Sequence, residues 1–185
     1  MWRRAWREAP SSNLDVCACV DRGLIGLEHT IVAVGKLGEA YWREACAEYV
    51  KRMGRFGGLN IVEIGEAKLP KSPTQADIER AVAREGEEML THLPKRAFVC
   101  GLFIEGRQRS STQLAQLLDE LPLRGFSQVV FLIGGSNGMS TAVRAACHEM
   151  LSFSPMTFPH QLMRVMLCEQ LYRAQTILAK TGYHK

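Results

Sequence analysis

Four side chains with chemical potential recur at intervals of four near the carboxyl end of the chain: His160, Arg164, Cys168 and Tyr172. That interval places them on one stripe of a helix, because residues four apart share a helical face. The stripe has two interpretations. It is either a partly buried polar seam where two subunits meet, or a functional row in which Arg164 binds a phosphate or stabilises developing negative charge.

A glycine-rich turn, FLIGGSNGMS at residues 131–140, raises the question of phosphate binding. A dinucleotide fingerprint requires the order G-x-G-x-x-G at the first strand-to-helix turn, whereas this turn begins with two adjacent glycines after the fourth predicted strand. A Walker-A loop requires Lys-Ser or Lys-Thr after its last glycine, and Met139-Ser140 stands there instead. Both phosphate interpretations are therefore poor. A tight turn that needs glycine only for backbone freedom is the plain alternative.

Three segments are expected to meet at the carboxyl edge of the predicted sheet: residues 100–106, 132–138 and 151–159. Open parallel sheets bind their ligands at that edge. The third segment, LSFSPMTFP, is apolar but interrupted, so its backbone N–H and C=O groups stay free of a strand ladder. Such a wall favours a flat, uncharged heterocycle, which the glycines of the turn would allow the backbone to approach closely. Three ordinary connections are the alternative.

The elements that must position these residues alternate between strand and helix. Apolar runs predict strands over residues 30–35, 59–64, 96–104, 127–133 and 151–154. Helical spacing predicts helices over residues 38–53, 74–90, 110–121, 140–150 and 158–180. Ser110 and Gln113 have the spacing of a capping box, and Pro159 suits the first turn of the last helix. Strands that are apolar throughout indicate an α/β fold, with a parallel sheet and helices on both faces.

Length and composition limit the possible functions. The chain has 185 residues, of which 46% are hydrophobic and 23% charged, an ordinary balance for one globular domain. No apolar run is long enough for a transmembrane helix, so no membrane partner is expected. The six cysteines are scattered and show no zinc spacing, which predicts no metal and a reducing, cytoplasmic location. The formal net charge of +4 is weak support for a polyanionic partner.

Residues 1–29 differ from the remainder and are expected to form a poorly ordered extension, with residues 30–185 as a single domain. The extension lacks the apolar core of a secretory signal. Its acidic Glu8, Asp15 and Asp21 argue against an organelle transit peptide, which stays the minority interpretation.

Three stretches resemble a known family. They are FLIGGSNG, the segment LSFSPMTFPHQLMRVMLCEQLYRAQTILAKTGYHK at the carboxyl end, and TIVAVGKLGEAYWREACAEYVKR at the start of the domain. Together they are similar to the RlmH family of 23S ribosomal RNA pseudouridine-N3 methyltransferases, in the SPOUT superfamily. Comparable members start near Leu27, so residues 1–26 have no counterpart; a misassigned start codon or an organelle address would explain them.

The resemblance implies a fold, a cofactor and a substrate. The fold would be a SPOUT-type parallel sheet flanked by helices with a C-terminal trefoil knot, working as a homodimer. S-adenosylmethionine (SAM) would donate a methyl group to N3 of a pseudouridine in 23S ribosomal RNA, on the assembled ribosome. The family's cofactor positions fall on Leu102, Gly134, Phe153, Ser154, Pro155, Met156, Thr157 and Phe158.

The resemblance also brings the C-terminal tail to the active site. His184 is therefore the first candidate for a general base or base-positioning group. Arg164 is the second candidate and Tyr172 the third. Arg107 and Arg109 flank the expected cofactor edge and are preferred as contacts to RNA phosphates.

Three other functions stay open from the sequence. A SAM- or nucleotide-binding RNA-binding module would bind its ligand without transferring a methyl group. A SPOUT methyltransferase acting on transfer RNA would usually carry an added RNA-binding domain, for which this chain has no room. A Rossmann-type oxidoreductase is opposed by the order of the glycines.

Overall fold

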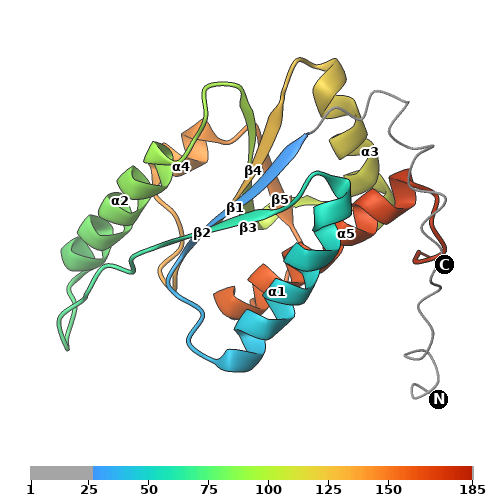
Figure 1. Ribbon diagram of the computed structural model, residues 1–185. Helices are drawn as coiled ribbons and strands as arrows, with labels where there is room; N and C mark the ends of the chain where they lie inside the picture. Colours follow the sequence, from blue (N-terminus) through green and yellow to red (C-terminus); the bar gives the residue numbers. More distant parts are fainter. Residues whose placement is uncertain (1–26, 185) are drawn as a thin grey trace.

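The computed structural model describes residues 27–184 (Figure 1). Most of the expected extension, residues 1–26, therefore lies outside the described residues, and so does Lys185. The first strand, β1, runs from Glu28 to Val34 and already buries the side chain of His29. The first strand thus begins two residues before the predicted one, because a buried histidine does not look like the start of an apolar run.

Five parallel strands form one sheet in the order β2-β1-β4-β3-β5. The strand bounds are Glu28–Val34 for β1, Asn60–Ile64 for β2, Ala97–Gln108 for β3, Gln128–Ile133 for β4 and Glu149–Ser152 for β5. Strands β1 and β4 lie inside the sheet and are buried along most of their length. They read as apolar runs because helices cover both of their faces. The predicted α/β class with a parallel sheet is confirmed.

Helices pack on both faces of the sheet (Figure 1). Their bounds are Ala40–Met53 for α1, Gln75–Thr91 for α2, Ser111–Leu123 for α3, Thr141–Ala146 for α4 and His160–Leu178 for α5, with a single 3-10 turn, η2, over Gly54–Phe56. Helices α1, α3 and α5 contribute Met53, Leu118 and Leu171 to the larger core. Helices α2 and α4 contribute Met89 and Val143 to the smaller core on the opposite face.

The fourth helix is shorter than its pattern predicts. Helix α4 ends at Ala146 rather than near residue 150, because Cys147 has an extended backbone. The following residue, His148, donates its N–H to the carbonyl of Val99 at 2.8 Å. That bond starts the pairing of β5 with β3, so β5 begins at Glu149, two residues before the predicted strand.

Two further boundaries depend on tertiary contacts. Strand β3 continues to Gln108, past an irregular stretch in its pairing with β5 between Leu102 and Arg107. The N-terminal capping box of α3 is confirmed, since Ser110 and Gln113 each bond the other's backbone N–H. Within residues 27–184, no helix combines the length and apolar character that a membrane crossing requires.

Candidate active site

A cavity of about 710 Å³ lies at the carboxyl edge of the sheet and is named the first cavity. Residues 102–105 of β3, the β4–α4 turn and the β5–α5 connection bound it. The predicted cofactor residues that line it are Leu102, Gly134, Phe153, Ser154, Met156, Thr157 and Phe158. Pro155 lies in the same connection but is exposed and is not among the lining residues. The three segments expected to converge do so.

The β5–α5 connection is held in place by a serine that the sequence analysis missed. Ser152 is 3% exposed, and its hydroxyl lies 2.8 Å from the carbonyl oxygen of Ile104 and 3.1 Å from that of Ser154. The hydroxyl of Ser154 in turn accepts the N–H of Met156 at 3.0 Å. These bonds replace a strand ladder, so the connection leaves the sheet and bends around the cavity. A serine interrupting an apolar run was the available signal.

The glycines of the β4–α4 turn serve the turn itself. Gly138 has a φ of 83°, a left-handed conformation that favours glycine, and its N–H reaches the carbonyl of Gly135 at 3.1 Å. A Cβ on Gly134 would lie 2.7 Å from the carbonyl oxygen of Gly138. The packing of the turn thus already requires glycine at these two positions, and the first cavity lies beside the resulting turn.

Arg164, the second catalytic candidate, is completely buried within the subunit. Its guanidinium lies 2.6 Å from the carboxylate of Glu63 and 3.0 Å from the carbonyl oxygen of Gly35. A contact with an RNA phosphate requires exposure, which this site does not provide. Arg164 instead joins the second turn of α5 to the carboxyl ends of β1 and β2, and this corrects its expected role.

The other three residues of the helical stripe lie in two places, the first cavity and the core. His160 is half-buried and lines the first cavity, whereas Cys168 and Tyr172 are buried in the core. The hydroxyl of Tyr172, the third candidate, accepts a hydrogen bond from Arg55 at 3.1 Å. The stripe is therefore not a continuous functional row, because three of its four residues are buried within this subunit.

The C-terminal tail is tied to α5 through Glu169. This carboxylate accepts hydrogen bonds from Arg173 at 2.6 Å, from the hydroxyl of Tyr183 at 3.2 Å and from Gln170 at 2.7 Å. The Tyr183 ring packs edge-on against Tyr172, and burial, together with the nearby Glu169 charge, raises the pKa of Tyr183. The tail is thus folded back, not frayed. Glu169 and Arg173, four residues apart, are a signal the sequence analysis left unused.

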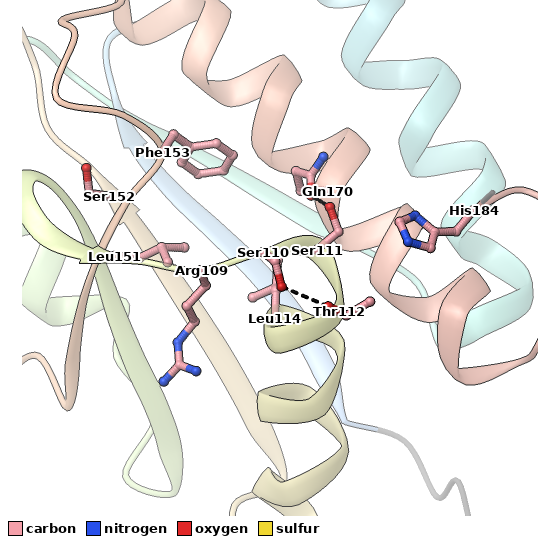
Figure 2. Close-up of a pocket in the computed structure, with 10 residues that line it drawn as sticks. All are labelled: Arg109, Ser110, Ser111, Thr112, Leu114, Leu151, Ser152, Phe153, Gln170 and His184. Atoms are coloured by element: carbon pink, nitrogen blue, oxygen red, sulfur yellow. Dashed lines mark hydrogen bonds between the residues drawn. The ribbon is translucent and has the colours of Figure 1, made fainter.

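A second cavity, of about 490 Å³, is bordered by the tail (Figure 2). Leu151, Ser152 and Phe153 line it as well as the first cavity, so the two adjoin. The exposed side chain of His184 lies at its other side, and His184 Nδ1 is 3.5 Å from Arg173 Nη1. His184 is therefore a surface group beside the second cavity and is not among the residues that line the first.

The two arginines preferred for RNA differ in their surroundings. Arg107 is exposed. Arg109 is mostly buried and forms a paired contact with Glu149, with Nη2 2.8 Å from Oε2. That ion pair raises the pKa of Arg109 and occupies its guanidinium, so the expected phosphate contact by Arg109 is corrected. Among residues 27–184, no group of three or more His, Cys, Asp and Glu side chains could hold a metal ion.

Known proteins resemble the chain over most of its length. A ribosomal RNA large subunit methyltransferase H from Bifidobacterium adolescentis is 47% identical over 156 residues, which cover 84% of this chain and 98% of that protein. A protein of the same name from Limosilactobacillus reuteri (strain DSM 20016) is 44% identical over 155 residues, with the same two coverages of 84% and 98%. The resemblance expected from the sequence is confirmed.

One solved structure and one protein family are also similar to this chain. The crystal structure of a probable rRNA-methyltransferase from Porphyromonas gingivalis has a TM-score of 0.45 and 12% identity, covering 83% of this chain and 71% of that one. That likeness is too distant to bear on function. The family described as "Predicted SPOUT methyltransferase" matches residues 27–184. The chain therefore belongs to the SPOUT methyltransferase family.

Proposed function

We propose that this methyltransferase uses SAM to methylate N3 of a pseudouridine in 23S ribosomal RNA. The first cavity carries the proposal, because three chain segments that are distant in sequence line it together. Its volume lies in the usual range for small-molecule sites. The names of the relatives, ribosomal RNA large subunit methyltransferase H, support ribosomal RNA as the substrate.

The residues of the first cavity suit an uncharged nucleoside with a sulfonium group. Phe153, Phe158 and Met156 offer apolar surface to a flat ring, and the backbone of residues 153–158 offers carbonyl oxygens to a cation. The charged side chains Arg144 and Glu105 at this cavity pair with each other. Bound SAM supplies an already activated methyl group, so the chain must align the target nitrogen, exclude water and remove one proton.

His184 is the proposed general base or base-positioning group. Its imidazole is exposed beside the second cavity, within reach of an incoming ligand. Histidine is suited to accept a proton near neutral pH. Tyr172 and Arg164 stabilise the protein behind this surface. The trefoil knot, the homodimer, the assembled ribosome as substrate and the cytoplasmic location belong to the same proposal and follow from the resemblance to the family.

Methyl transfer from tritiated SAM to ribosomes that lack the modification tests the proposal. His184→Ala, and a chain that ends before Tyr183, should retain SAM binding and lose transfer by about 100-fold or more, the usual contribution of a general base. His92→Ala is the matched control, because His92 is an exposed histidine at the end of α2. Transfer at the wild-type rate by the shortened chain would refute the role of the tail. SAM binding with no transfer by the wild type would favour a binding module.

A further inference from the structure

The second cavity adjoins the first, and Phe153 is the one predicted cofactor residue among those that line it. We infer that it receives the nucleotide to be methylated, turned out of its RNA helix; this inference rests on the proposed function. A base inside a duplex does not offer its N3 to an enzyme, so the enzyme binds an unpaired base or extrudes a paired one. Either route requires a pocket for one base beside the methyl donor.

The position of the second cavity meets that requirement. Leu151, Ser152 and Phe153 line both cavities, so the two cavities meet along one short segment of chain. Methyl transfer requires the reacting atoms to approach within about 3–3.5 Å. A base in the second cavity lies against the same segment as a cofactor in the first. The volume of about 490 Å³ is in the usual range for a small-molecule ligand.

A hydrogen-bonded pair in the second cavity matches the edge of a uracil-type base. Ser111 donates its hydroxyl to Gln170 Oε1 at 2.7 Å (Figure 2). Gln170 Nε2 donates to Glu169 at 2.7 Å. The Ser111 oxygen keeps lone pairs that can accept an N–H. Gln170 Nε2 keeps a second hydrogen that can be donated to a carbonyl. In pseudouridine, ring N1 carries an N–H next to the C2 carbonyl, so the pair can read both groups and leave N3 free for methylation.

The remaining lining favours a base over a phosphate group. Phe153, Leu114 and Leu151 supply apolar surface on which a ring can pack. The guanidinium of Arg109 points away from Ser111 and Gln170 (Figure 2) and is paired with Glu149. A phosphate would therefore meet a cation that is already neutralised, whereas a neutral ring would meet apolar surface and unused hydrogen-bonding atoms.

The second cavity and the C-terminal tail depend on the same carboxylate. Glu169 fixes the Gln170 amide and also accepts the hydroxyl of Tyr183, the residue before His184. The imidazole of His184 and the Ser111–Gln170 pair both line this cavity (Figure 2). A base bound there has its edge fixed by the pair and a proton acceptor in the same cavity.

Two variants test this site with the full-length protein. Ser111→Ala removes the hydroxyl, and Thr112→Trp places a bulky ring at an exposed lining position. Gln116→Trp, on the exposed face of the same helix, is the control for bulk. The measurements are the SAM dissociation constant, and kcat and KM with ribosomes that lack the modification. We expect kcat/KM to fall by about 10-fold for Ser111→Ala and by about 100-fold for Thr112→Trp, with SAM binding and the control unchanged.

The SAM affinity and the rate of methyl transfer together distinguish failure of the nucleotide site from failure of the proposed function. If kcat/KM of both variants equals that of the wild type, the second cavity does not bind the nucleotide. If either variant loses SAM binding together with transfer, the cavity supports the cofactor site and the inference is also wrong. If the wild type itself transfers no methyl group to ribosomes, the proposed function fails, and the inference fails with it.

Discussion

Arg164 carries a charge into a part of the protein that water does not reach. Its side chain is 0% exposed, whereas that of its partner Glu63 is 32% exposed. The carbonyl oxygen of Gly35 is a second acceptor, but the Arg164 Nε has no partner among the described residues. Burying an ion is costly unless a counter-charge accompanies it. The carboxylate of Glu63 is therefore the group on which this burial depends.

Glu63→Ala should lower the free energy of unfolding by about 3 kcal/mol, because it leaves the guanidinium buried without its counter-charge. Urea unfolding of the purified protein measures the change. Glu48→Ala is the matched control, since it removes a carboxylate from the more exposed ion pair with Arg52. The control should lose less than about 1 kcal/mol. Equal losses in the two variants would show that Arg164 is hydrated.

At the scale of elements, the β4–α4 turn shows how local packing shapes a binding surface. Gly134 and Gly138 approach each other so closely that a Cβ on the former would overlap the backbone of the latter. The hydroxyl of Ser140 accepts the N–H of Val143 at 3.3 Å and starts α4 immediately after the turn. The turn is thus fixed at both ends, and its shape determines one side of the first cavity.

Gly134→Ala should weaken SAM binding by about 10-fold or more, equivalent to about 1.4 kcal/mol. The added methyl group must displace the backbone at Gly138, and the wall of the cavity moves with it. Titration calorimetry with SAM gives the affinity. Gly38→Ala is a suitable control, because a Cβ at Gly38 meets no atom within 4 Å. Wild-type affinity in Gly134→Ala would place the cofactor elsewhere.

At the scale of the whole molecule, His29 links folding to pH. Burial is the main reason that the pKa of His29 falls from its ordinary value of 6.5 to about 4. The unfolded chain therefore binds a proton at a higher pH than the folded protein does. The contribution of His29 to the free energy of unfolding is fully present above about pH 6.5 and is lost as the pH falls toward about 4.

This histidine should account for about 2 kcal/mol of the stability lost between about pH 7 and about pH 5. His29→Gln removes the titrating group, so its free energy of unfolding should change less over that interval. Urea unfolding at both pH values gives the difference, and His92→Gln, at an exposed position, serves as the control. An identical pH dependence in His29→Gln and the wild type would show that His29 titrates normally.

The sequence predicts the elements better than the partners of individual side chains. Strands and helices follow from local apolar patterns, and the three segments around the first cavity follow from the rule for parallel sheets. The partner of Arg164 does not, because Glu63 is 101 residues away, on strand β2. The same limit applies to Ser111, whose partner Gln170 is 59 residues distant. The spacing of residues along a helix shows which of them share a face, but it does not show whether other elements of the fold bury that face.

Phe153 lines both cavities at once. Shortening its side chain would enlarge both spaces, and enlarging it would shrink both together. Affinity for one occupant therefore cannot be tuned at this position without altering the fit of the other. The donor and the acceptor of the methyl group would therefore meet beside the Phe153 ring and not across it.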